Sequence, residues 1–153
     1  MALYLVRHAK AGDRHRWSGP DELRPLSPAG QRQAAGLVEL LGRHARGPIL
    51  SSPSLRCVQT VEPLARDRGL TVATIPQLAE GTSFVDVLEL LAGLPDGAVL
   101  CSHGDLIPDV VDALCRRGME VRGQPDWRKG ATWVLERRDG SFVAGHALPP
   151  PKR

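Results

Sequence analysis

The sequence predicts an α/β fold, a three-layer α/β/α sandwich built around a mainly parallel central sheet. Short aliphatic runs, which are typical of strands buried in parallel sheets, alternate along the chain with segments that carry apolar residues at helical spacing. Strands separated by helices imply crossover connections, and these place helices on both faces of the sheet. The length of 153 residues, with 42% hydrophobic and 24% charged residues, fits one globular domain with one core.

The first half of the chain is expected to supply three strands and two helices. Three segments have the pattern of strands: 3–6, 48–50 and the threonine-containing run 70–75. The first helix is expected to begin at Ser27 and Pro28, because serine is a good N-cap and proline a good first helical residue. The second is expected to begin at Ser52 and Pro53 for the same reason, and to end at Gly69.

The second half is expected to add two helices, one buried strand and a closing hairpin. Two segments repeat apolar residues at helical spacing: 84–91 and 107–114. Three segments have the pattern of strands: 98–101, 131–135 and 141–144. The last two are joined through Asp139 and Gly140, a pair that favours a tight turn between antiparallel strands.

Composition limits the location and the partners that we expect. No apolar run reaches the roughly 20 residues that span a bilayer, and the N-terminus lacks the pattern of a signal peptide, so we expect a cytoplasmic protein with no membrane partner. The net charge of +3 is too small and too dispersed to indicate a nucleic acid polymer as partner. We expect one domain over 1–148, a flexible tail over 149–153, and a monomer or weak dimer.

The cysteines and histidines do not have the spacing of metal ligands. Cys57, Cys101 and Cys115 form no C-x-x-C pair, which argues against a disulfide framework or a structural zinc site. The histidines show no H-E-x-x-H spacing. We therefore expect neither a metal nor another cofactor.

Charged and imidazole side chains follow the ends of three predicted strands. Arg7 and His8 follow the first apolar run, and Arg56 lies in the first turn of the helix after the second run. His103 and Gly104 follow the fourth run. Because ligands of open parallel sheets bind beyond the carboxyl ends of the strands, these side chains are expected to meet at one edge. Nearby helix N-termini would add N–H groups that suit an anion.

Histidine surrounded by arginine indicates phosphoryl chemistry. Arginines near His8 disfavour its protonation, so we expect a neutral imidazole that acts as a nucleophile. Guanidinium groups match phosphoryl oxygens and stabilise their charge in the transition state. The expected reaction is transfer of a phosphoryl group to His8, followed by hydrolysis. Glu80, in a loop at the same edge, is the candidate acid that protonates the leaving group; a solvated loop carboxylate is the alternative.

Five segments resemble, in order, the motifs of the histidine phosphatase superfamily, whose fold is called phosphoglycerate mutase-like. They are LYLVRHAKAG (3–12), LRPLSPAGQRQAAGL (23–37), ILSSPSLRCVQTVEPLA (49–65), LAEG (78–81) and VLCSHGDLI (99–107). The resemblance implies a phosphohistidine mechanism without a cofactor. It implies His8 as the nucleophile, Arg7, Arg56 and His103 as the phosphate pocket, and Glu80 as the proton donor.

Two features of this sequence depart from patterns found in that family. Ala9 stands where the family has a glycine after the catalytic histidine, and alanine restricts the backbone there. The insertion that forms a lid domain in the larger mutases is absent, and the compact size is similar to the SixA-like branch of phosphohistidine phosphatases. The stretches 11–27 and 56–65 also resemble the phosphatase-like domain that follows a Nudix domain in some nucleotide hydrolases.

The expected function is hydrolysis of phosphomonoesters or of phosphohistidine, so the partner is a phosphorylated small molecule or a phosphohistidine protein. A nucleotide-related phosphohydrolase and a non-catalytic phosphate-binding module of the same fold stay open as alternatives. Lys10 and Ser102 are further candidates for phosphate binding. The loop with Lys10, Arg14, Arg16 and Trp17 would contact a second phosphate and a base, or is simply solvated.

Overall fold

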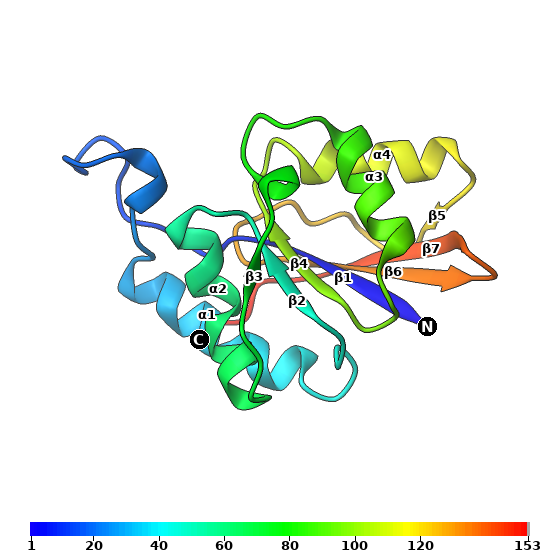
Figure 1. Ribbon diagram of the computed structural model, residues 1–153, viewed down its shortest axis with the longest axis horizontal. Coiled ribbons are helices and arrows are strands. Elements are labelled where there is room, and N and C mark those ends of the chain that lie inside the picture. Colours follow the sequence, from blue (N-terminus) through cyan, green and yellow to red (C-terminus); the bar gives the residue numbers. More distant parts are fainter. Residues whose placement is uncertain (153) are drawn as a thin grey trace.

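A seven-stranded sheet in the order β3-β2-β4-β1-β6-β7-β5 forms the middle layer of the computed structural model, which describes residues 1–152 (Figure 1). The strands are β1 (Ala2–Arg7), β2 (Ile49–Ser51), β3 (Ala73–Thr74), β4 (Val99–Ser102), β5 (Glu120–Val121), β6 (Thr132–Arg138) and β7 (Ser141–Leu148). β6 is antiparallel to both β1 and β7, and the other neighbouring strands pair in parallel. The prediction of a mainly parallel sheet is confirmed.

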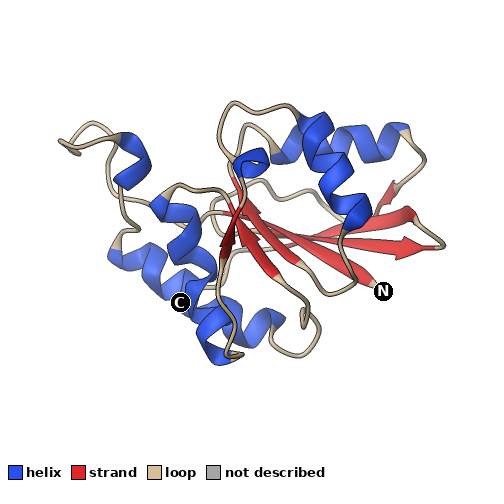
Figure 2. Cartoon of the chain, viewed as in Figure 1, coloured by secondary structure: helices blue, strands red, loops and turns tan. Residues whose placement is uncertain are grey.

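Helices cover both faces of this sheet (Figure 2). The four α-helices are α1 (Pro28–Leu41), α2 (Leu55–Asp67), α3 (Phe84–Gly93) and α4 (Ile107–Arg116), and two short 3-10 turns are η1 (Asp21–Leu23) and η2 (Pro76–Leu78). α1 packs beside α2 on one face, and α3 packs beside α4 on the other. The predicted three-layer α/β/α sandwich is therefore confirmed.

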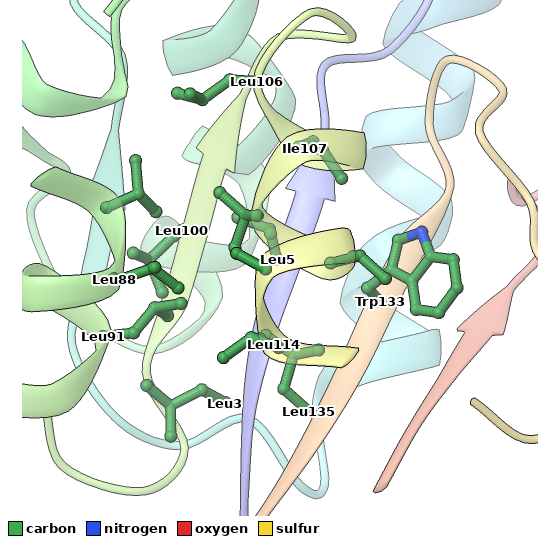
Figure 3. Packing of buried hydrophobic residues seen from close by; sticks show 14 of the residues in the cluster. Leu3, Leu5, Leu88, Leu91, Leu100, Leu106, Ile107, Leu114, Trp133 and Leu135 are labelled. Carbon is green, nitrogen blue, oxygen red and sulfur yellow. The ribbon is translucent and has the colours of Figure 1, made fainter. Parts of the chain in front are cut away.

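Each face of the sheet has its own hydrophobic cluster because successive strand side chains point to opposite faces. Leu5 of β1 and Leu100 of β4 lie in the cluster that Leu91 of α3 and Leu114 of α4 complete (Figure 3). Val6, the next residue of β1, belongs instead to the cluster under α1 and α2. Each fully buried aliphatic side chain contributes roughly 1.5–3 kcal/mol. These two layers of packing hold the ends of β1 and β4 in fixed positions at one edge.

Several element boundaries differ from the sequence-based expectation. The second helix begins at Leu55 with Ser54 as its N-cap residue, so the expectation that Ser52 caps it is wrong. The strand expected over 70–75 shrinks to Ala73–Thr74, whose two side chains are exposed. β5, η1 and η2 are too short to show a periodic pattern and were not expected. The hairpin through Asp139 and Gly140 is confirmed.

The segment after β7 lies against the body of the protein. Pro150 and Pro151 are half-buried, and Arg153 lies outside the described residues. The division into a domain over 1–148 and a flexible tail over 149–153 stays a prediction. Within residues 1–152, no helix combines the length and the apolar character that crossing a membrane requires.

Candidate active site

The carboxyl ends of β1 and β4 bring two histidines together. β1 and β4 pair in parallel with Arg7 opposite Ser102, so the residues that follow, His8 and His103, leave the sheet side by side. The His8 N–H donates to the Ser102 carbonyl at 3.0 Å, and the two imidazole centroids lie 5.5 Å apart. The structure therefore places together two residues that are 95 positions apart in the sequence.

The imidazole of His8 is neutral and holds one defined tautomer. Burial lowers its pKa from 6.5 to about 3, and the positive charges of His103, Arg56 and Arg7 add to that effect, while a hydrogen bond to the Ala9 carbonyl partly opposes it. Nδ1 lies 2.8 Å from that carbonyl oxygen, which can only accept, so the proton is on Nδ1. Nε2 therefore carries a lone pair, and this is the form of histidine that acts as a nucleophile.

Ala9 does not strain the backbone after His8. Among residues 1–152, the one non-glycine residue with a positive φ is Asp139, so Ala9 has an ordinary conformation. The Ala9 side chain is fully buried, and its N–H donates to Thr60 Oγ1 of α2 at 2.9 Å. Alanine at this position is thus compatible with the position of the imidazole.

His103 is held from one side and has a free polar atom. Its Nε2 lies 2.8 Å from Ser52 Oγ and 3.5 Å from Cys57 Sγ. The Ser52 oxygen also accepts the Ser54 N–H at 3.3 Å. Nδ1 of His103 is buried and has no hydrogen-bond partner within residues 1–152. A buried polar atom without a partner is a group that a bound ligand can satisfy.

Arg7 is locked beneath the loop that follows β4. Its Nη1 donates to the Trp127 carbonyl at 2.6 Å. A methyl group at Gly104 would lie 2.5 Å from Cζ of Arg7, so the guanidinium occupies the space that a side chain at position 104 would need. Glycine is therefore required at position 104 because the arginine approaches so closely.

Arg56 lies in the first turn of α2 and is almost fully buried. Its Nη1 donates to the Asp21 carbonyl at 2.9 Å, and its Nη2 lies 3.2 Å from Asp21 Oδ2 and 3.7 Å from Glu80 Oε1. Its Nε has no partner among residues 1–152. These contacts fix the guanidinium, which is oriented by the carboxylates of Asp21 in η1 and Glu80 in the loop after η2.

Glu80 reaches the same hollow as the two histidines. It follows η2, and Asp105 Oδ2 fixes this turn by accepting the Gly81 N–H at 2.9 Å. The hollow has a volume of about 450 Å³. It is lined by Arg7, His8, Ala11, Gly12, Asp13, Arg14, Arg24, Glu80, His103, Gly104, Asp105 and Lys129. A base, an acid candidate and several cations therefore face one space.

Lys10 and Ser102, two further candidates for phosphate binding, do not line this hollow, and neither does Arg56. The Ser102 hydroxyl is fully buried and donates to the Leu78 carbonyl at 2.6 Å, so it ties β4 to η2. Lys10 lines an adjoining hollow. Direct contact of either side chain with the transferred phosphoryl group stays a prediction.

Arg24 and Lys129 also line the hollow but were not predicted from the sequence. Arg24 is buried, donates to the Gly12 carbonyl at 2.7 Å and contacts Asp21 at 3.1 Å. It lies in the second of the five family-like segments, and that position is the signal that could have revealed it. Lys129 precedes β6, and no strand-end pattern marks it.

The charges in this hollow suit a phosphoryl anion. Burial lowers the pKa of Lys129, and the positive charges of Arg7, Arg24, Arg14 and Arg56 lower it further. Within residues 1–152, no group of three or more histidine, cysteine or carboxylate side chains is arranged to hold a metal ion. An anion with several oxygen atoms would accept hydrogen bonds from guanidinium and imidazole groups around the nucleophile.

Comparison with known proteins gives a family match and a similar curated protein. Residues 3–84 match the family described as the histidine phosphatase superfamily, branch 1. The chain is 36% identical over 156 aligned residues to an 8-oxo-(d)GTP phosphatase from Mycolicibacterium smegmatis; the match covers 97% of this chain and 48% of that protein. The chain thus spans about half the length of this relative.

Solved structures share the fold at low sequence identity. The protein histidine phosphatase SixA in complex with tungstate superposes with a TM-score of 0.71 at 22% identity, covering 97% of this chain and 94% of SixA. The alpha-ribazole phosphatase from Shigella flexneri superposes with a TM-score of 0.68 at 16% identity, covering 100% of this chain and 96% of the other. The fold is the phosphoglycerate mutase-like one, without a separate lid domain. From the family match over residues 3–84 and the relative at 36% identity, the chain belongs to the histidine phosphatase superfamily.

Proposed function

We propose that this chain is a phosphatase that hydrolyses phosphomonoesters through a covalent phosphohistidine on His8. The observation that carries the proposal is the state of His8: a buried, neutral imidazole whose Nδ1 is engaged and whose Nε2 lone pair is free. It lies at the wall of a hollow that also holds Arg7, His103 and Glu80. A phosphoryl group bound there would meet the nucleophile and the charges that stabilise its transition state.

The proposed reaction has two steps. In the first, the Nε2 lone pair of His8 attacks phosphorus, the P–O bond to the leaving group breaks, and the acid form of Glu80 gives its proton to the departing oxygen. In the second, the Glu80 carboxylate takes a proton from water, whose oxygen attacks phosphorus. The N–P bond then breaks and its electron pair returns to Nε2. The products are an alcohol and orthophosphate.

A nucleotide-related substrate is the second candidate, and one structural feature favours it. A hollow of about 330 Å³ beside the catalytic one is lined by Arg14, Trp17, Gly19, Asp21 and Glu80. The Trp17 side chain is 38% exposed, and its Nε1 donates to the Pro20 carbonyl at 2.8 Å, which fixes the ring. An exposed indole held in this way can stack on a base. The relative from Mycolicibacterium smegmatis is itself described as an 8-oxo-(d)GTP phosphatase.

Trapping the intermediate tests the covalent step. When the enzyme turns over a ³²P-labelled aryl phosphate and is quenched in alkali, we expect label on His8 that is stable to base and lost in acid, as phosphorus–nitrogen bonds are. His15→Asn, which changes a surface histidine, is the matched control and should label normally. Turnover without label would mean direct attack by water. Absence of both label and turnover would identify a non-catalytic phosphate-binding module.

The leaving group tests the role of Glu80. For Glu80→Gln we expect about a 10²- to 10³-fold loss of kcat on an alkyl phosphate, because an alkoxide departs poorly without a proton. The loss on an aryl phosphate or on phosphohistidine should be below about 10-fold, since those groups need less help. Glu22→Gln, at an exposed carboxylate in η1, is the control. Equal losses on all substrates would contradict the acid role.

A further inference from the structure

A second hollow adjoins the catalytic one and is strongly cationic. Its volume is about 470 Å³. It is lined by Lys10, Ala29, Arg32, Gln33, Arg128, Lys129, Pro150, Pro151 and Lys152. Five of these side chains are basic and none of the described lining residues is acidic. Lys129 lines both hollows, so the two spaces adjoin at this residue. We call the second space the Lys10–Lys129 hollow.

Most of the cations of this hollow have no ion-pair partner among residues 1–152. Arg128 is neutralised by Asp126, whose carboxylate accepts its Nε–H at 3.0 Å. Among residues 1–152, no ion pair joins Lys10, Arg32 or Lys129 to a carboxylate. Positive charges that are gathered without anions repel one another, and binding an anion between them would relieve that repulsion.

The walls of the hollow are held in place by one buried amide. Gln33 of α1 accepts the Lys10 N–H with its Oε1 at 3.0 Å and donates from its Nε2 to the Lys129 carbonyl at 3.5 Å. Its side chain is buried, and both bonds are partly shielded from solvent. Gln33 thus links the loop after β1, which carries Lys10, to the loop before β6, which carries Lys129. The two lysines are presented from fixed backbones rather than from independent mobile loops.

The same framework supports the nucleophile. The N–H of Gly130, the residue after Lys129, donates to the carbonyls of Arg7 and His8 at 3.1 and 3.0 Å. Gly130 has a φ of +88°, and a methyl group there would lie 3.2 Å from the Gln33 side chain, so the close packing requires glycine. The position of Lys129 is therefore coupled through a single residue to the backbone of His8. A substrate that contacts both Lys129 and His8 is therefore positioned by backbone segments that are hydrogen-bonded to each other.

We propose that the Lys10–Lys129 hollow is a subsite for a second phosphoryl group that is covalently linked to the one transferred to His8. The substrate class is then a small molecule with a chain of phosphoryl groups, whose terminal group enters the catalytic hollow while the next groups contact Lys129, Lys10 and Arg32. This inference rests on the proposed phosphatase function and narrows its substrate. A short polyanion suits the hollow because several cations line one open space and no described acidic residue lines it.

Inorganic phosphates of increasing length test the subsite. Orthophosphate, pyrophosphate and tripolyphosphate are compared as inhibitors of aryl phosphate hydrolysis, at constant ionic strength and with a chelator present. In the wild type we expect the inhibition constant of tripolyphosphate to be about 10-fold lower than that of orthophosphate, because only the longer anion reaches Lys10 and Arg32. In Arg32→Gln that ratio should fall to about 3 or less, since a guanidinium contact is removed.

Arg43→Gln is the matched control, because it removes the same charge from an exposed turn after α1 that does not line either hollow. It should keep the wild-type ratio. A wild-type ratio near 1, or the same ratio in Arg32→Gln as in the wild type, would overturn the subsite. Inhibition by an acidic peptide that is stronger than by tripolyphosphate and depends on Arg32 would overturn it in favour of a protein partner.

Direct binding separates failure of this inference from failure of the proposed function. If the chain hydrolyses no aryl phosphate, yet calorimetry shows Arg32-dependent binding of tripolyphosphate, the phosphatase proposal fails and the subsite stands. If the chain hydrolyses aryl phosphate but longer inorganic phosphates inhibit it no more strongly than orthophosphate, the phosphatase proposal stands and the subsite fails.

Discussion

Replacing His8 with asparagine is expected to lower kcat on an aryl phosphate by at least about 10⁴-fold, because the variant lacks the atom that forms the intermediate. Asparagine is the informative choice. Its amide N–H can replace the Nδ1 donor to the Ala9 carbonyl, so the backbone at this position keeps its hydrogen bond. The space of the distal imidazole nitrogen is left without a nucleophile. The change therefore removes the chemistry with little disturbance to the surrounding packing.

The kinetic measurement needs two accompanying results. His15→Asn, in an exposed loop, should retain wild-type kcat, and His8→Asn should still bind orthophosphate, because Arg7, Arg24 and His103 remain. A His8→Asn enzyme that kept more than about 1% of wild-type kcat would contradict a nucleophilic role, since loss of a covalent nucleophile costs far more than that. Such a result would transfer the role to water activated by another group.

Acidification from pH 7 to pH 4 is expected to cost the wild type about 3 kcal/mol more in free energy of unfolding than it costs His8→Asn. The folded state holds the pKa of His8 at about 3, against 6.5 for an unperturbed histidine. Below pH 6.5 the imidazole at position 8 binds a proton in the unfolded chain but stays neutral in the folded chain. The free energy of unfolding therefore falls as the pH falls towards 3. Asparagine has no such titration, and its stability lacks this contribution.

Urea unfolding of both proteins at pH 7 and at pH 4 measures the difference. Other groups titrate over this range as well, but they are common to both proteins and cancel in the comparison. If the two proteins lost equal stability on acidification, His8 would have to accept a proton readily in the folded state, and the argument for a neutral nucleophile would fail. His15→Asn serves again as the control, because it removes an exposed histidine that does not line the hollow.

The edge at which the site lies was predictable because it follows from topology. Parallel strands with helical crossovers place their carboxyl ends together, so Arg7, His8 and His103 were expected at one place before any coordinates, and the 5.5 Å separation of the imidazoles agrees. The three layers were predictable from the same alternation of strands and helices. Glu80 was expected at that edge because its loop joins the third strand to the third helix, and the structure places it there.

The remaining features depend on tertiary contacts that no local pattern carries. Serine often caps helices, but α2 begins only at Leu55, so Ser52 does not cap it. The Ser52 hydroxyl instead contacts the imidazole of His103. Ser102 ends its strand as expected, but its hydroxyl donates a hydrogen bond to the Leu78 carbonyl of η2. Lys129 was missed because the strand-end argument considers residues that follow a strand, and Lys129 lies before one.

The reversed direction of β6 has a consequence for how such a protein can change its preference for substrates. Among the described strands, β6 alone is antiparallel to both of its neighbours. The connection over 122–131 comes before β6, and it therefore lies at the same edge of the sheet as the loops that follow β1 and β4. From Trp127 onwards this connection is tied to the reaction centre, because the Trp127 carbonyl accepts from Arg7 Nη1 and the Gly130 N–H donates to the carbonyls of Arg7 and His8. Changes of length or sequence over 122–126 are therefore the ones expected to alter substrate preference while β1, β4 and the nucleophile stay in place.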